Sequence, residues 1–199
     1  ASTATSLTFQ TVILNLQLNG TIDGAGGKGG KGRSESSGYI SPTVGQDGGT
    51  AFYTRVYINL TYGAAAKLRG GGGGGGGSAT GDGNDLVGGG GGGGAGTIPG
   101  PGGPSGTGTQ TAEAGAAGTA ETGGIGGRSW TKNVPFALAG LDSNYRGGTG
   151  GAIGHAGSKG ANQFSHTGAN GGAVGKAIDG ASYVTQSGTP ASLLGGQVN

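Results

Sequence analysis

Two stretches near the N-terminus alternate apolar and polar residues in the way that β-strands do. In residues 7–18, Leu14, Leu16 and Leu18 share one side and polar residues occupy the other, a period of two that predicts a half-buried strand. Residues 52–62 alternate over a longer stretch and are rich in aromatic and β-branched side chains, which favour strands. We expect these two strands to form a small β cap.

Glycine replaces this pattern further along the chain. A run of eight glycines fills residues 70–77, and a run of seven fills residues 88–94. Glycine has no side chain to bury and loses the most backbone entropy on ordering, so neither run predicts a helix or an ordinary strand. Such runs are either flexible linkers or polyproline II segments, which have three residues per turn and need hydrogen-bond partners on neighbouring segments.

The spacing of the other glycines favours ordered segments. In one stretch glycine recurs at every third position, at Gly148, Gly151, Gly154, Gly157 and Gly160. On a threefold helix, residues 24–32 have two bare glycine faces and a third face that carries Ala25, Lys28 and Lys31. Bare faces allow helices to approach closely enough for backbone hydrogen bonds between them. The sequence therefore predicts a sandwich of packed polyglycine II helices; the alternative, a disordered linker, leaves this period unexplained.

Composition supports one ordered domain over residues 1–199. Charged residues make up 10% of the chain and the net charge is +2, whereas disordered tails are usually highly charged. We predict a mostly irregular and β fold. Residues 1–62 form the β cap with the first glycine tract, residues 63–185 form the polyglycine sandwich with variable loops, and residues 186–199 form a C-terminal closing segment.

The same composition excludes several classes of function. Nucleic-acid binding requires clustered Lys and Arg, and a net charge of +2 is poor evidence for it. No apolar run approaches the roughly 18 residues that a membrane span requires, so we expect no membrane insertion. The chain has no cysteine, which excludes disulfides and thiolate metal sites.

The chain offers few catalytic groups. Its histidines are His155 and His166; Ser165 precedes His166, but adjacency in sequence does not make a catalytic triad, which depends on geometry. We therefore expect a protein that is not an enzyme and that uses no cofactor.

Residues 81–87, with the sequence GDGNDLV, are similar to the calcium-binding nonapeptide of β-helical toxins. Asp82, Asn84 and Asp85 could supply oxygen ligands. That fold requires stacked copies of the motif, and the chain has one. We expect no metal site here, and we interpret the motif as a polar loop between two glycine helices.

Large aromatic side chains do not fit inside a glycine sandwich. Trp130, Phe136, Tyr145 and Phe164 therefore either plug the ends of the sandwich or are presented on loops, where aromatic residues commonly anchor recognition surfaces.

The order of these tracts resembles the tip adhesins of the long tail fibres of T-even bacteriophages. The resemblance covers about residues 20–185 and is carried by a strand, a GGKGGKG-like tract, a second strand, GGGGGGGG, a polar break, GGGGGGGAG, variable loops, GGIGGR, GGTGGAIG and GGAVGKAIDG. It implies a sandwich whose variable loops bind an outer-membrane protein or lipopolysaccharide of a Gram-negative host. These loops would be residues 78–87, 97–122, 128–146 and 161–167.

The resemblance also implies a place in the virion, at the distal tip of the tail or tail fibre. A tail-fibre or tail-tip protein would then be the partner at the N-terminal end. The chain is either a tip adhesin or the terminal receptor-binding piece of a larger tail protein.

We expect at least two of the loops at residues 78–87, 128–146 and 161–167 to meet at the end of the sandwich away from the cap. The predicted receptor-binding residues are Asp82, Asn84, Asp85, Trp130, Phe136, Tyr145, Arg146, Phe164 and His166. Two other functions remain open. An ice-binding polyproline II bundle needs a flat face of small residues, which long aromatic loops would interrupt, and a glycine-rich matrix protein would show uniform repeats.

Overall fold

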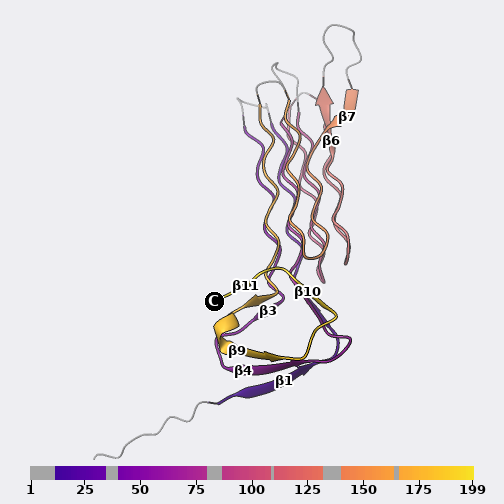
Figure 1. The fold of residues 1–199 in the computed structure, drawn as a ribbon. Coiled ribbons are helices and arrows are strands. Elements are labelled where there is room, and N and C mark those ends of the chain that lie inside the picture. The colour runs from indigo at the N-terminus through magenta and orange to yellow at the C-terminus, as the bar shows by residue number, and fades with distance from the viewer. Residues whose placement is uncertain (1–11, 35–39, 80–86, 109, 132–139, 164–165) are drawn as a thin grey trace, which may run out of the picture.

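The computed structural model describes residues 12–34, 40–79, 87–108, 110–131, 140–163 and 166–199. Figure 1 shows short strands that form a cap at one end and a bundle of long extended segments that runs away from it. β6 (Arg128–Thr131) and β7 (Gly140–Arg146) lie at the opposite end of the bundle, which we call the tip. The fold is irregular and β, as predicted. Its described helical element is the short 3-10 turn η1 (Ala181–Tyr183), and no described helix has the length or apolarity to cross a membrane.

The cap consists of small parallel sheets, and each sheet joins strands from residues 14–69 with strands from residues 178–198. One sheet contains β1 (Leu14–Leu18), β4 (Ile58–Tyr62) and β9 (Val184–Ser187); another contains β2 (Thr21–Asp23), β5 (Lys67–Arg69) and β10 (Ser192–Leu194); the last contains β3 (Phe52–Tyr53), β8 (Ile178–Asp179) and β11 (Gln197–Val198). The central strands of these three sheets are β4, β5 and β8. The chain therefore passes around the cap three times, first through β1, β2 and β3, then through β4, β5 and β8, and last through β9, β10 and β11. The second turn lies between the other two.

The apolar core of the protein lies inside this cap. Along β4 the side chains of Ile58, Leu60 and Tyr62 are buried while Asn59 and Thr61 are exposed, which is the alternation that the sequence predicts. They pack with Leu18, Ala66, Leu68, Ala177 and Ile178. The predicted N-terminal strands pair directly, but the cap is larger than predicted, because segments after residue 177 add strands to every sheet.

The stretch at residues 52–62 is not one continuous strand. β3 ends at Tyr53, and β4 begins at Ile58 in a different sheet. Between them the Thr54 hydroxyl accepts a hydrogen bond from the Val56 N–H (3.1 Å) and donates one to the Val56 carbonyl (2.9 Å). This local bonding turns the chain around a corner of the cap, so Val56 is exposed rather than buried with the other apolar residues.

The bundle is inserted into the cap between β2 and β3 and again between β5 and β8. Residues 70–79 run through its middle. Their N–H groups donate with a period of three, so that every third residue donates to the same neighbouring segment. Gly71, Gly74 and Gly77 donate to residues 43–49. Gly72, Gly75 and Ser78 donate to residues 89–95, and Gly73, Gly76 and Ala79 donate to residues 155–161. Their carbonyl oxygens accept from three further segments in the same period, so this segment has bonded neighbours on every side.

Residues 87–96 have an equivalent set of neighbours, and the hydrogen bonds arrange the described segments in layers. One outer layer contains residues 42–50, 24–33 and 97–106; the middle layer contains residues 168–177, 70–79, 87–96 and 112–119; the other outer layer contains residues 155–161, 146–153 and 122–128. Segments that follow one another in the chain run in opposite directions, so their connections alternate between the cap end and the tip.

The two central glycine runs of the middle layer, residues 70–77 and 88–94, leave no room for a side chain. A Cβ atom added to Gly75 would lie 2.0 Å from the carbonyl oxygen of Gly148, and one added to Gly92 would lie 1.9 Å from that of Gly124. These oxygens belong to backbone groups that are themselves held in the bundle, so they cannot rotate away as a flexible side chain would. Glycine is the residue that this spacing accepts.

Two stretches with the composition of loops are instead largely part of the bundle. Residues 42–50 are polar and contain the turn-forming pair Asp47 and Gly48, but Thr43, Gln46 and Gly49 donate to residues 25–31. Residues 97–122 were expected to be a variable loop, but residues 97–106 and 112–119 are bonded into the layers. The prolines of this stretch are compatible with an extended segment because their fixed φ suits it. Pro101 and Pro104 are exposed, so their missing N–H groups leave no interior acceptor unpaired.

Candidate functional site

At the tip, the chain reverses direction between segments that run away from the cap and segments that run back towards it. The described residues that flank these connections are Ser34 and Ile40, Ala79 and Val87, Gly108 and Gln110, Thr131 and Gly140, and Gln163 and His166. Segment direction explains this gathering, because residues 24–33, 70–79, 97–106, 122–128 and 155–161 all run from the cap towards the tip.

A buried pair of serines joins the bases of two predicted recognition loops. The Ser78 and Ser129 hydroxyls lie 2.6 Å apart, and the Gly89 N–H donates to both oxygens at 2.8 and 3.1 Å. Both serines are fully buried. Next to them the Trp130 N–H donates to the Val87 carbonyl at 2.9 Å. The loop at residues 78–87 and the loop at residues 128–146 therefore start from one hydrogen-bonded base.

The third predicted loop is bonded to the same base. The Ala79 N–H donates to the Ala161 carbonyl at 3.1 Å, and the Ala161 N–H donates to the Arg146 carbonyl at 2.8 Å. β7, which ends at Arg146, pairs antiparallel with β6, and the Arg146 guanidinium donates to the Gly126 carbonyl at 3.2 Å. The structure thus brings the bases of all three loops together at the tip.

An ion pair supports β6 from the side. The Arg128 Nε donates to Glu113 Oε2 at 2.8 Å, the Arg128 N–H donates to the same oxygen at 3.1 Å, and Arg128 Nη2 contacts Glu113 Oε1. These hydrogen bonds hold the pKa of Glu113 at about 2, below its usual 4.5, and the nearby charge of Arg146 acts in the same direction. Glu113 therefore remains a carboxylate, and a fixed hydrogen-bond acceptor, at any pH near neutrality.

The described predicted site residues lie at the tip but differ in their surroundings. Trp130, Tyr145, Arg146 and His166 are each half-buried. His166 also exchanges a pair of backbone hydrogen bonds with Gln163, both at 3.0 Å. The other predicted site residues, Asp82, Asn84, Asp85, Phe136 and Phe164, lie outside the described residues.

The possible calcium ligands belong to that second group, so the expectation that this motif binds no metal stays a prediction. Elsewhere, the described residues contain no group of acidic and histidine side chains that could hold a metal ion.

Sequence reasoning missed the residues that hold the tip together. Ser78 directly follows a glycine run, Ser129 is separated from Gly127 by Arg128, and Glu113 pairs with Arg128 across 15 positions. A serine directly after a glycine run signals the end of the tract, but the sequence does not identify its partner. The tip also includes Ser34, whose hydroxyl accepts a hydrogen bond from the Thr107 N–H at 3.0 Å. Ser34 and Thr107 therefore lie at the tip beside the bases of the predicted loops.

Comparisons with known proteins agree on one family. The family model of the phage tail fibre adhesin Gp38 matches residues 1–198. A chain in the crystal structure of the gp37-gp38 adhesin tip complex of the bacteriophage S16 long tail fibre is similar in fold, with a TM-score of 0.56 and 24% sequence identity. The similarity covers 92% of this chain and 58% of that chain, so the present chain spans little more than half the length of its structural relative. A search of curated proteins found no match.

Proposed function

Since the chain belongs to the family of the phage tail fibre adhesin Gp38, we propose that its tip binds a receptor on a Gram-negative host, either an outer-membrane protein or lipopolysaccharide. A tail fibre adhesin is a component of the virion and acts at the host cell surface. The family is one of adhesins, which favours a binding protein over an enzyme and over the ice-binding alternative.

The observation that carries this proposal is the shared base of the tip loops. Ser78, Ser129, Arg146 and Ala161 connect residues from three separate loops through backbone and buried hydroxyl hydrogen bonds. A loop that starts from a rigid base loses less conformational entropy when it binds, so more of its contact energy appears as affinity. The tip can therefore hold binding loops of different sequence on the same hydrogen-bonded base.

The proposed contacts are the predicted site residues. Trp130 and Tyr145 would act as aromatic anchors, and Arg146 and His166 as polar contacts beside them. Asp82, Asn84, Asp85, Phe136 and Phe164 complete the proposed surface from the loops outside the described residues.

Replacing the aromatic anchors tests the location of the receptor surface. Trp130→Ala or Tyr145→Ala should weaken binding to host cells by about 2 kcal/mol, a roughly 30-fold change in affinity, because aromatic anchors dominate binding energies. Tyr53→Ala is the matched control, since Tyr53 is exposed on β3 in the cap. Binding to cells and melting temperature are measured for each variant. If the tip variants unfold while binding per folded molecule is unchanged, these side chains plug the bundle and the receptor surface lies elsewhere.

We also infer that the bundle segments are polyglycine II helices. The support is the period of three in their hydrogen bonds, each of which joins one segment to a neighbour, as expected for a helix with three residues per turn and no internal hydrogen bonds. Amide hydrogen exchange tests this inference. The N–H groups of residues 71–77 should exchange only on global unfolding, whereas a flexible tract would exchange within seconds.

The cap end is the proposed attachment site for a tail-fibre protein. The structural relative was solved as a complex of gp37 with gp38. β1 is an edge strand, and its first residue Leu14 and the preceding Ile13 are both exposed. Ile13→Asp should weaken copurification with the fibre protein about tenfold or more, since burying an aliphatic side chain contributes about 1.5–3 kcal/mol. Ile98→Asp, on the exposed side of the bundle, is the control. Equal retention of the partner by both variants would move the attachment site away from β1.

A further inference from the structure

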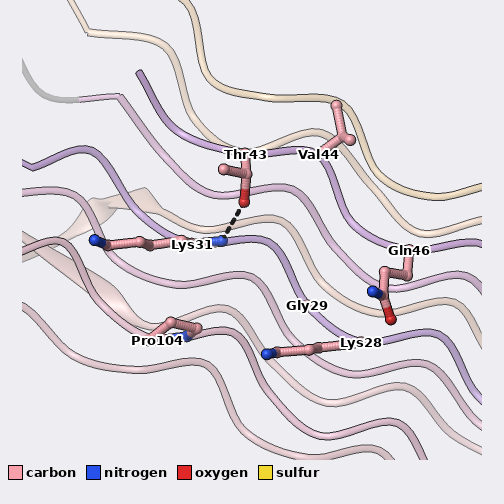
Figure 2. A pocket seen from close by; sticks show the side chains of 7 residues that line it. All are labelled: Lys28, Gly29, Lys31, Thr43, Val44, Gln46 and Pro104. Carbon is pink, nitrogen blue, oxygen red and sulfur yellow. Dashed lines mark hydrogen bonds between the residues drawn. The ribbon is translucent and has the colours of Figure 1, made fainter. Parts of the chain in front are cut away.

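A groove with basic side chains lies on the outer face of the bundle, between the cap and the tip. It has a volume of about 300 Å³ and is lined by Lys28 and Lys31 from one segment, Thr43, Val44 and Gln46 from the next, and Pro104 from a third. We call it the lysine groove. Figure 2 shows the ammonium groups of Lys28 and Lys31 pointing in the same direction along this face.

Backbone bonding fixes the outward direction of the lysines. The N–H groups of Gly29 and Gly32 donate to residues 101–104, and those of Gly27 and Gly30 donate to residues 72–75. The remaining series, Ala25, Lys28 and Lys31, turns away from both of these neighbours. Lys28 is exposed and Lys31 is half-buried, so both amines reach solvent from the outer layer.

The lining of the groove is rich in available donors. Among the described residues neither lysine takes part in an ion pair, and no carboxylate lines the groove. The Thr43 Oγ1 accepts the Lys31 N–H at 2.7 Å, which leaves the hydroxyl hydrogen free to donate outward. The Gln46 amide side chain has no hydrogen bond within the described part of the chain. The nearest acid on the same segment, Asp47, instead accepts from the Ala173 N–H at 2.7 Å, on the far side.

Apolar surface borders these donors. The Pro104 ring and the Val44 side chain are both exposed at the groove. Amines, a hydroxyl and an amide beside aliphatic surface suit a sugar that carries phosphate, because the donors take the phosphate oxygens and the aliphatic groups take the C–H face of the ring. No aromatic side chain lines the groove, which argues against single-stranded nucleic acid, whose bases stack on aromatic residues.

We propose that the lysine groove binds the phosphorylated core sugars of lipopolysaccharide as an accessory site. The proposal rests on the proposed function, since a tip bound at the outer membrane would bring the side of the bundle among surface polysaccharides. Exposed lysine–phosphate contacts are individually weak and screened by salt. The groove therefore orients the bundle at the cell surface rather than selecting the receptor.

The test compares two double variants of the full chain with the same loss of charge. Lys28→Gln with Lys31→Gln removes both amines from the groove, whereas Lys159→Gln with Lys176→Gln removes exposed lysines from other segments. Binding is measured to purified lipopolysaccharide with its core phosphates, to the same material after enzymatic dephosphorylation, and to vesicles containing phosphatidylglycerol.

The groove variant should lose affinity for phosphorylated lipopolysaccharide about five- to tenfold at low salt, and the control variant less than about twofold. Wild-type binding should fall after dephosphorylation, should weaken at about 0.15 M salt, and should be weaker to vesicles than to lipopolysaccharide. Equal loss in both variants, equal binding to vesicles, or no binding by the wild type would overturn the proposal.

The tip and the groove can fail separately. Trp130→Ala should weaken binding to cells, and in the Trp130→Ala background the pair Lys28→Gln and Lys31→Gln should still lower the affinity for phosphorylated lipopolysaccharide about five- to tenfold at low salt. If the wild-type protein binds no host cell, but the groove variant still loses affinity for phosphorylated lipopolysaccharide, the proposed function fails and the groove proposal stands. If the tip variants lose cell binding, but the groove variant binds lipopolysaccharide as the wild type does, the groove proposal fails and the proposed function stands.

Discussion

Apolar side chains stabilise the cap, whereas backbone groups stabilise the bundle. In the cap, Leu60 and Leu68 are almost fully buried and pack with other apolar side chains. In the middle of the bundle, residues 70–77 are equally buried but have no side chains, and their backbone groups bond to neighbours on every side. Buried apolar area stabilises the first region, whereas close backbone contact and complete hydrogen bonding stabilise the second.

This difference predicts opposite tolerances to substitution. An apolar core accepts a side chain of similar volume with a modest loss of stability. In the bundle the smallest possible side chain, a methyl group, already meets a backbone oxygen at about 2 Å, as at Gly75 (2.0 Å). The effect of a substitution in the bundle thus depends on the space at that position rather than on the hydrophobicity of the new side chain.

The largest expected effect is that of a methyl group in the middle layer. Gly75→Ala should destabilise the protein by roughly 4 kcal/mol or more, because overpacking costs about 1–3 kcal/mol and several stretched hydrogen bonds cost about 1 kcal/mol each. Gly20→Ala is the control, since a Cβ at Gly20 meets nothing within 4 Å. Urea unfolding compares the two variants, and similar midpoints would mean that the bundle is not closely packed.

A cavity in the cap should have a smaller effect. Leu60→Ala should cost about 3 kcal/mol through lost burial and the space left behind, whereas Leu60→Met should cost less than about 1.5 kcal/mol. Thermal unfolding of both variants measures the difference. If Leu60→Met is as damaging as Leu60→Ala, the cap is as intolerant of shape as the bundle, and the contrast between the two regions fails.

The junction of the two regions depends on one buried guanidinium. Arg69 in β5 bonds to both carboxylate oxygens of Asp23 at 2.8 and 2.7 Å and to both of Glu121 at 2.9 Å. Asp23 belongs to β2 in the cap, whereas Glu121 lies in a turn of the bundle. Arg69→Met should destabilise the protein by about 2 kcal/mol, because it leaves the mostly buried Asp23 carboxylate without its partner.

The Arg69 variant distinguishes a junction from a local contact. Hydrogen exchange should rise in residues 119–124 as well as in β2 of the Arg69→Met variant. Asp47→Asn, which changes an exposed carboxylate on the bundle, is the control and should leave exchange in both regions unchanged. Increased exchange confined to β2 would mean that Glu121 does not couple the bundle to the cap.

The smallest expected effect is the acid sensitivity of the tip. The pKa of Glu113 is lowered from 4.5 to about 2 by Arg128, so its contribution is complete above its unfolded pKa and is lost as pH falls from about 5 towards 2. Both side chains are 38% exposed, and solvent screening limits the effect to less than about 1 kcal/mol. Glu113→Gln should therefore be slightly less stable than wild type at pH 7, with the difference vanishing near pH 2. A difference that persists at pH 2 would assign the loss to packing.

The sequence predicted those elements whose pattern is local. The alternation around Leu60 identified β4, and the period of the glycines indicated segments that make close contacts. It did not reveal that residues 42–50 and 97–106 belong to the bundle, because their outward positions carry polar residues and prolines that are typical of loops. Glu121 occupies the position at which the series Gly115, Gly118, Gly124 and Gly127 would otherwise have glycine. Its partner Arg69 lies 52 positions away, and no local pattern connects the two residues.

The candidate site was predictable to a similar extent. Antiparallel segments of similar length bring their connections to common ends, so the meeting of the bases of the loops at residues 78–87, 128–146 and 161–167 follows from topology. The bonds that join their bases, such as the contact between the Ser78 and Ser129 hydroxyls, depend on positions in three dimensions. Sequence patterns place those serines at tract ends without pairing them.

The run of identical residues from Gly70 to Gly77 has a consequence for how the chain settles into place. Nothing within the run distinguishes one alignment from another, so the segment could slide by a residue and still offer the same bare faces to its neighbours. The choice must come from its two ends. Arg69 is held by Asp23 and Glu121, and Ser78 is held by Ser129 and Gly89. These side chains act as stops that select a single alignment, and their loss would permit slipped arrangements that displace the base of the loop at residues 78–87 relative to the neighbouring loops.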